Sequence, residues 1–337
     1  MKPFRALIGG AVAAMLTTAS FAAEHTLTIS SWAPPGHGMN ASMWPNLIAM
    51  IEDATDGKVT AEIKYRLAPP PAQMDLVQDG AADMTWIFHG YQAGRFTATK
   101  LIELPGYEGN AEAASVAYWR VHEAHLGAAN EHKGVKLIGL MTHGPAQVHS
   151  SKKITSLSEI SGMKLRVPGG VGGDAGAALG ATGIKVPAPK VYETLASNAA
   201  DGVVMPMEAR KGFKLTEVAQ NVYEMPGGLY RGSFALIMNQ EAFDALPADI
   251  QAALDEKVFG EPLSRMAGQV WDAIDVDGRS VTEGTSDNSI NTASDADQAA
   301  YATIGDKIRE AVLADISAKG IDAQAAYEMV KSEMAAN

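Results

Sequence analysis

Residues 25–30 read HTLTIS, residues 58–65 read KVTAEIKY and residues 82–88 read ADMTWIF, and these three stretches decide the fold class. Each is short and rich in β-branched or apolar residues, which predicts a strand. Apolar residues recur at helical spacing over residues 40–55, and a second, shorter helix is expected before Gly80. This order predicts parallel strands joined by right-handed crossovers, and therefore an α/β domain.

The rest of the chain continues the alternation of strands and helices, without an internal repeat or a flexible linker. Strands are expected at Val135–Met141, Ser161–Val167, Asp201–Val204 and Gly232–Asn239. Helices are expected at Ala111–His132, Asp174–Ala181 and Pro189–Ala196, and through most of Ser286–Asn337. A further helix should start at Pro247 and run beyond Glu256, with a break or kink at Pro262. Two α/β lobes with several chain crossings fit this pattern better than two consecutive domains.

Composition and charge narrow the classes of partner. The 337 residues are 47% hydrophobic and 20% charged, as in a globular protein. Lys and Arg number 27 against 39 Asp and Glu, a formal charge of −12 that would repel nucleic acid or an anionic membrane surface. Because the chain has no Cys, disulfides, thiolate nucleophiles and Cys-ligated metal centres are excluded. We expect no nucleic-acid partner.

The first 22 residues have the pattern of a secretory signal peptide. Lys2 and Arg5 precede the apolar stretch Ala6–Leu16, and small residues at Ser20 and Ala22 allow cleavage after Ala22. This stretch is shorter than the roughly 20 residues that a membrane-spanning helix needs, and no later stretch is suitable. We therefore expect an exported protein that is not embedded in a membrane, with a mature charge of −14. An uncleaved anchor or a buried helix is the alternative.

A glycine-rich turn after a predicted strand fits the GxGxx(G/A) spacing of dinucleotide-binding loops. Gly170, Gly172 and Ala175 occupy the motif positions, and Glu193 lies near where a ribose-binding acid would be. Gly and Ala dominate this neighbourhood in any case, and Asp174 would place a carboxylate where a pyrophosphate approaches. We therefore expect no nucleotide and no other cofactor.

His122 and His125 would share one face of the helix expected over residues 111–132. Two imidazoles could contribute to a metal site, which leaves an exported metal-dependent hydrolase as the alternative function. A metal site needs three or four convergent ligands, however, and this segment is not an HExxH motif. No GxSxG motif is present, and no Ser or Lys has an obvious activating base beside it. We expect neither a metal ion nor an enzyme.

Arg166 is the candidate with a definite chemical role. It lies in GMKLRVP at residues 162–168, where strand alternation places Lys164 and Arg166 on the face opposite the apolar residues. The strand ends at a Pro-Gly-Gly turn, and strand ends in α/β sheets face the ligand crevice. A guanidinium there offers a planar pair of donors to a carboxylate, although two solvated cations on an edge strand would have the same spacing.

Several motifs follow one another in a specific order between about Trp32 and the C-terminus. They are QDGAADM at 78–84, GYQAGRF at 90–96, GMKLRVPGG at 162–170, VPAPKVYETL at 186–195, ADG at 200–202, and Met238-Asn239 before Leu246-Pro247. No single motif is decisive, but their order and spacing together are specific. In these motifs the chain resembles the DctP-type substrate-binding proteins of TRAP (tripartite ATP-independent periplasmic) transporters.

The resemblance implies a two-lobed periplasmic binding protein, type II-like and of the Venus-flytrap kind, with a helical C-terminus. Lobe I would comprise residues 23–147 with about 235–272, and lobe II residues 148–234 with about 273–337. A protein of this kind captures a small organic acid between its lobes and delivers it to membrane permease subunits that an ion gradient drives. We therefore expect a periplasmic monomer without enzymatic activity.

The resemblance also implies which residues bind the acid. The family's arginine in its GxKxR motif maps onto Arg166 and grips the ligand carboxylate. Where the family often has an Asn, this chain has Val204-Met205-Pro206. Ala146 stands where sialic-acid binders carry a second arginine, so a sialic acid-like ligand is not expected.

Further side chains near the expected strand ends are candidate walls of the site. They are Trp32, Trp86, Phe88, His89 and Tyr91 in the first lobe, and Met207, Glu208, Tyr230 and Phe234 near the second lobe or hinge. Each aromatic residue could instead be ordinary core, which is the favoured interpretation for Phe234. Glu208 could accept a hydrogen bond from a ligand hydroxyl or amine, or begin a solvated helix. Aromatic walls with His89 would suit an aromatic or hydroxylated acid.

Overall fold

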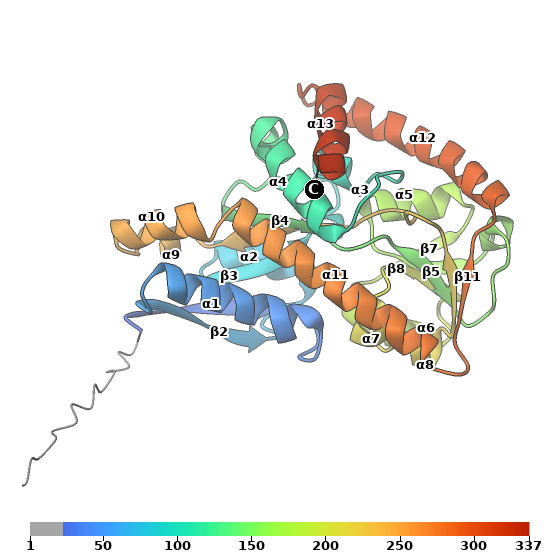
Figure 1. Ribbon diagram of the computed structural model, residues 1–337, viewed down its shortest axis with the longest axis horizontal. Coiled ribbons are helices and arrows are strands. Elements are labelled where there is room, and N and C mark those ends of the chain that lie inside the picture. The colour runs from blue at the N-terminus through green and yellow to red at the C-terminus, as the bar shows by residue number, and fades with distance from the viewer. Residues whose placement is uncertain (1–22, 337) are drawn as a thin grey trace, which may run out of the picture.

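The computed structural model describes residues 23–336 as two β-sheets flanked by helices (Figure 1). Both sheets mix parallel and antiparallel strands, so the predicted α/β class is confirmed. The predicted signal peptide, residues 1–22, lies outside the described residues. Within residues 23–336, none of the helices combines the length and the apolar character that crossing a bilayer requires.

The first sheet has the strand order β2-β1-β3-β10-β4. Its strands are β1 (His25–Ser31), β2 (Val59–Tyr65), β3 (Met84–Phe88), β4 (Lys136–Thr142) and β10 (Ser233–Met238). β1 pairs in parallel with β2 and β3, as the sequence predicts, and α1 (Trp44–Ala54) and α2 (Gln73–Gln78) form the crossovers. β10 runs antiparallel between β3 and β4 and brings a distant part of the chain into this sheet.

The second sheet has the strand order β11-β9-β5-β8-β6-β7. Its strands are β5 (Gln147–Ser150), β6 (Lys164–Val167), β7 (Thr182–Lys185), β8 (Gly202–Met205), β9 (Asn221–Glu224) and β11 (Ser289–Thr292). β6 pairs in parallel with β7 and β8, whereas β5 runs antiparallel to β8 and β9. This arrangement places β6, with Arg166, inside the sheet.

Helices cover both sheets, and one long helix packs against elements of both. They are α3 (Lys100–Glu103), α4 (Ala111–Ala124), α5 (Gly170–Ala178), α6 (Val191–Ala196), α7 (Ala209–Gly212), α8 (Leu215–Val218), α9 (Gln240–Asp244), α10 (Ala248–Lys257), α11 (Glu261–Glu283), α12 (Asp295–Ser317) and α13 (Ala323–Ala336). α11 packs on α4 and β4 and also on α7 and β11, so it runs alongside both sheets (Figure 1). Glycines permit this close packing, because a Cβ at Gly268 would lie 2.6 Å from the Cα of Glu112.

The chain crosses between the sheets at three places, which accords with the expected interlobe crossings. It passes from β4 to β5, returns from β9 to β10, and leaves again through α11 toward β11. Strands of the first sheet fall within residues 25–142 and 233–238, and those of the second within 147–224 and 289–292. The exact lobe boundaries stay a prediction. Buried apolar residues of both sheets also pack into shared clusters, so the two halves touch extensively.

Several helix boundaries differ from the prediction. The helix expected over residues 111–132 ends at Ala124, and a 3-10 turn, Leu126–Ala129, follows it. The break expected at Pro262 is present, because α10 ends at Lys257 and α11 begins at Glu261. Pro262 lies in the first turn of α11, where its missing N–H costs nothing. The helix expected from Asp174 already begins at Gly170, and the C-terminal region expected to be helical also contains β11.

Candidate ligand-binding site

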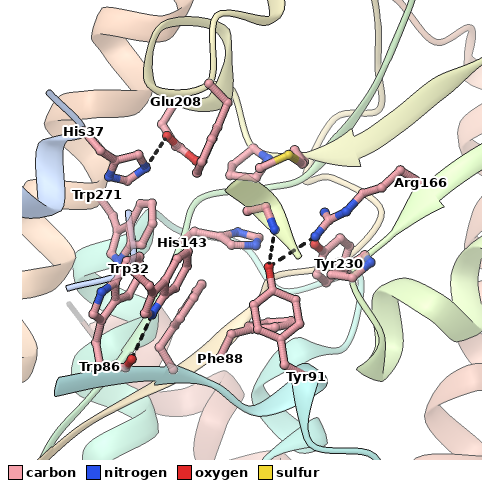
Figure 2. Close-up of a pocket in the computed structure, with 16 residues that line it drawn as sticks. Trp32, His37, Trp86, Phe88, Tyr91, His143, Arg166, Glu208, Tyr230 and Trp271 are labelled. Atoms are coloured by element: carbon pink, nitrogen blue, oxygen red, sulfur yellow. Dashed lines mark hydrogen bonds and ion pairs between the residues drawn. The ribbon is translucent and has the colours of Figure 1, made fainter. Parts of the chain in front are cut away.

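A cavity lies between the two sheets, where strands of both end (Figure 2). The empty space among its lining residues is about 380 Å³, part of which is open to solvent. The 16 residues drawn in Figure 2 line it: Trp32, His37, Trp86, Phe88, Tyr91, His143, Arg166, Pro168, Ala188, Met205, Pro206, Glu208, Phe213, Tyr230, Phe234 and Trp271. From the predicted set, the structure therefore brings together Trp32, Trp86, Phe88, Tyr91, Arg166, Glu208, Tyr230 and Phe234.

Arg166 occupies the β6 side of this cavity and is only 1% exposed. Its Nε donates to the carbonyl oxygen of Val186 at 2.8 Å, and its Nη2 donates to the hydroxyl of Tyr91 at 3.2 Å. No carboxylate of residues 23–336 lies within ion-pair distance of the guanidinium. Lys164, on the same strand, is exposed, whereas Arg166 is buried. The alternative of two solvated cations therefore does not hold for Arg166. Unused N–H donors of a buried cation thus adjoin open space.

Tyr91 joins the two halves of the protein at the edge of the cavity. It ends the 3-10 turn His89–Tyr91, which directly follows β3. Its hydroxyl oxygen accepts hydrogen bonds from Arg166 and, at 2.8 Å, from the backbone N–H of Ala188. Both donors belong to the second sheet and its loops. The hydroxyl hydrogen of Tyr91 is therefore free to point elsewhere, including toward a ligand.

Aromatic rings form the opposite wall. Trp32 and Trp86 are stacked with ring centroids 3.9 Å apart, and the indole N–H of Trp32 donates to the carbonyl oxygen of Trp86 at 3.0 Å. Phe234, expected in the core, lies 5.4 Å from Trp86 and 5.5 Å from Trp271 while also lining the cavity. Because these rings are held by one another, the wall is rigid and apolar.

Two imidazoles of the lining were not predicted. His37 follows the Pro-rich turn after β1, and His143 follows β4. Burial lowers the pKa of His143 to about 4, so this ring is neutral at physiological pH. Its Nδ1 lies 2.7 Å from the carbonyl oxygen of Gly144. The position just after a strand was the available signal for His143, as it was for Tyr91 after β3.

Glu208 lies across the cavity from Arg166, at the N-terminal end of α7 (Figure 2). Its carboxylate is 3.0 Å from Nε2 of His37, and both side chains are almost fully buried. Its backbone N–H donates to Oδ1 of Asp275 at 2.7 Å, which fixes the residue to α11. The alternative that Glu208 begins a solvated helix is therefore wrong.

Two predicted wall residues lie elsewhere. His89 is buried beside the cavity, with Nδ1 3.0 Å from Oγ of Ser233 and Nε2 2.9 Å from Nε2 of His132. The turn after β3 directs His89 inward and Tyr91 into the cavity. Met207 lines a separate surface hollow together with Asp275 and other residues of α11. Neither side chain reaches the lining described above.

The glycine-rich segment is arranged against nucleotide binding. Gly170 already lies within α5, and Oε2 of Glu103 accepts the backbone N–H of Val171 at 2.8 Å. A carboxylate of the protein thus occupies the helix N-terminus that a phosphate would need. A Cβ at Gly170 would come within 2.4 Å of that carboxylate, which explains a glycine here without a nucleotide.

The metal-site alternative also finds no support in the geometry. The ring of His122 contacts that of His132 at 5.7 Å between centroids, and burial lowers the pKa of His122 to about 4. Over residues 23–336, no group of three or more His, Asp or Glu side chains is placed to hold a metal ion. Among these described residues, His122 and His125 thus lack the further ligands that a metal-dependent hydrolase would need.

Known proteins resemble this chain over almost its whole length. A TRAP periplasmic solute-binding protein from Bordetella bronchiseptica, solved with bound (R)-mandelate and (S)-mandelate, is 37% identical; the match covers 92% of this chain and 98% of that chain, with a TM-score of 0.89. A TRAP solute-binding protein from Rhodoferax ferrireducens T118, in complex with copurified benzoate, is 27% identical; the match covers 92% and 97%, with a TM-score of 0.85.

Sequence comparison agrees with the structural matches. The outer membrane transporter protein TsaT of Comamonas testosteroni is 27% identical over 336 residues, which is 99% of this chain and 98% of that protein. The model of the bacterial extracellular solute-binding protein family 7, DctP, matches residues 29–321. The predicted two-lobed binding-protein architecture is thereby confirmed. The chain belongs to this DctP family, the solute-binding proteins of TRAP transporters.

Proposed function

We propose that this protein captures an aromatic carboxylic acid between its two lobes in the periplasm and delivers it to the membrane subunits of a TRAP transporter. The observation that carries the proposal is the Arg166 guanidinium, buried, short of acceptors and open to a cavity with aromatic walls. The N-terminal export pattern and the family support the location and the delivery step.

The physical argument begins with the cost of burial. A buried charge that keeps unused hydrogen-bond donors is unfavourable by several kcal/mol unless a partner arrives. A carboxylate supplies two acceptors in the plane of the guanidinium, and the Tyr91 hydroxyl could donate to it as well. The acid and Arg166 thereby neutralise each other in a space that excludes water.

The remainder of the ligand is expected to be a flat ring. The lining beyond Arg166 is dominated by Trp, Phe and Tyr side chains, among which an aromatic ring gains stacking and edge contacts. Ala146 stands where sialic-acid binders carry a second arginine, and Val204-Met205-Pro206 stands where the family often has an Asn, which fits one anionic group rather than several. The relatives that hold mandelate and benzoate support the same class of ligand.

Isothermal titration calorimetry with four matched compounds tests this proposal. Benzoate and mandelate should bind, whereas benzamide, which keeps the ring but lacks the charge, should bind at least about 30-fold more weakly. Cyclohexanecarboxylate, which keeps the charge but lacks the aromatic ring, should bind about tenfold more weakly than benzoate. Benzamide binding as tightly as benzoate would contradict the anchor, and tight binding of aliphatic acids alone would contradict the aromatic class.

A further inference from the structure

The Glu208 end of the cavity carries polar chemistry that a benzoate anchored at Arg166 does not use. Glu208 is 3% exposed, His37 is 1% exposed, and both line the cavity. Figure 2 shows them across the cavity from Arg166. A buried carboxylate normally has several hydrogen-bond donors around it. The carboxylate of Glu208 therefore lacks the donors that a buried carboxylate usually has, and a ligand could supply one.

The tautomer of His37 follows from its contacts. The backbone N–H of Met39 donates to Nδ1 at 3.2 Å, so Nδ1 accepts, and a neutral ring carries its proton on Nε2. This Nε2 lies 3.0 Å from Oε2 of Glu208, although the geometry is not that of a hydrogen bond. In residues 23–336 no side-chain or backbone donor makes a hydrogen bond to the Glu208 carboxylate. The carboxylate thus keeps acceptor capacity on the cavity side.

Packing holds both side chains in place. A Cβ at Gly212 would lie 2.6 Å from Oε2 of Glu208 and 2.8 Å from Cδ2 of His37, so the backbone of α7 closes over the pair. The ring of Phe213 lies 5.1 Å from that of His37, and the ring of Trp271 lies 6.0 Å from it. Such apolar surroundings strengthen any hydrogen bond made to Glu208 and penalise an unpaired one.

We propose that Glu208, positioned by His37, selects aromatic acids that carry a hydrogen-bond donor, a hydroxyl or amino group, on the ring remote from the carboxylate. The inference rests on the proposed function and adds the substituent to it. A ring hydroxyl would donate to the free acceptor of Glu208. A second carboxylate on the ring would meet Glu208 as a like charge in a space of low dielectric, so the site would reject aromatic dicarboxylates.

Calorimetry on the full mature chain tests the inference with wild-type protein first. Hydrogen bonds to charged groups contribute about 1.5–3 kcal/mol. The better of 3- and 4-hydroxybenzoate should therefore bind at least about tenfold more tightly than its methoxy counterpart, which has the same shape but no donor. Benzene-1,4-dicarboxylate should bind at least about tenfold more weakly than benzoate.

The variant Glu208→Met, which keeps the length of the side chain but has no acceptor oxygen, then assigns the effect to one side chain. It should reduce the hydroxy-to-methoxy preference to less than about threefold, whereas the exposed control Glu193→Met should leave that preference unchanged. If wild-type protein binds benzoate but shows no hydroxyl preference, or if Glu208→Met keeps that preference, the inference is overturned and the proposed function stands. If neither benzoate nor any analogue binds, the proposed function fails and the inference fails with it.

Discussion

Arg166 and Arg210 are two buried arginines of this chain with different surroundings. Arg166 is 1% exposed and Arg210 is not exposed at all. Arg210 donates to the backbone carbonyl group of Ala219, to Oγ1 of Thr282 at 3.0 Å and to the side-chain oxygen of Asn288. Arg166 has two protein acceptors and faces a cavity.

The comparison shows which feature marks a binding site. Neither arginine has a carboxylate within ion-pair distance among the described residues, so the absence of an acid does not distinguish them. Desolvation lowers the pKa of Arg210 to about 10, and its oxygen partners connect α7 with α11 and the segment before β11. Arg210 is therefore a structural cation. Unfilled donors beside open volume identify Arg166 as the cation that awaits a ligand.

The largest expected effect is on ligand affinity. Arg166→Ala should weaken benzoate or mandelate binding by at least about 30-fold, since truncating one partner of a buried charge pair costs about 2–5 kcal/mol. Thermal stability should stay the same or rise, because an incompletely paired buried charge disappears. Calorimetry and thermal melting of the same preparation measure both, with Lys164→Ala, on the same strand, as the control. A folded Arg166→Ala protein with wild-type affinity would refute the comparison.

The second effect is on stability and tests the other member of the pair. Arg210→Met keeps much of the side-chain volume but leaves the oxygens of Ala219, Thr282 and Asn288 without their donor. Each buried group left without a partner costs about 1–3 kcal/mol, so unfolding in urea should show a loss of roughly 3 kcal/mol or more. Ligand affinity, measured well below the melting temperature, should change less than about threefold. If Arg210→Met instead lost ligand affinity strongly and kept its stability, Arg210 would be a ligand-binding residue rather than a structural one.

Local sequence patterns predicted much of the fold and the anchor. The apolar alternation at 25–30 and 82–88 gives β1 and β3, and the parallel pairing follows from the helices between them. The role of Arg166 as the ligand anchor was predictable from its position in an apolar strand before a Pro-Gly-Gly turn. Burying a charged residue there is unfavourable unless the charge gains a partner. Its burial and its unfilled donors became visible only with the partner elements in place.

The rest depends on contacts between distant parts of the chain. β11 is four residues long and is stabilised by parallel pairing with β9. β5 is stabilised by antiparallel pairing with β8 and β9. Because both strands depend on these distant partners, neither shows a strong local sequence pattern. His37 and Trp271 reach the cavity from segments more than 200 residues apart. His89 failed as a wall residue because the direction of a side chain in a turn depends on the backbone dihedrals rather than on its position in the sequence.

The smallest expected effect is a dependence of stability on pH, set by buried groups on both sides of the cavity. Burial lowers the pKa of the histidines below the usual 6.5: to about 4 for His122 and His143, to about 3 for His132 and His149, and well below 6.5 for His89. Between about pH 4 and 6.5 the unfolded chain therefore binds more protons at these sites, and stability rises with pH.

Two acids act in the opposite direction. Desolvation raises the pKa of Glu103 to about 7 and that of Asp275 to about 8. The folded chain therefore binds more protons at these sites from about pH 4 up to 7 or 8, and stability falls with pH across that window. Below pH 6.5 the five histidines raise the stability with pH by more than the two acids lower it, because they are more numerous. Above pH 6.5 only the two acids still change their protonation, so the stability falls.

The melting temperature should therefore reach its maximum near pH 6.5 and decline by a few degrees toward pH 8. Thermal melting in a buffer series from pH 5 to 9 measures this profile. Asp275→Asn keeps an oxygen that can accept the backbone N–H of Glu208 but no longer ionises, so it should flatten the decline above pH 6.5. The same series on Arg210→Met should shift the whole curve downward without moving its maximum, because Arg210 stays charged throughout this range. A wild-type melting temperature that climbs steadily to pH 8 would show that Glu103 and Asp275 ionise without cost, and that the interior between the lobes is wetter than their burial implies.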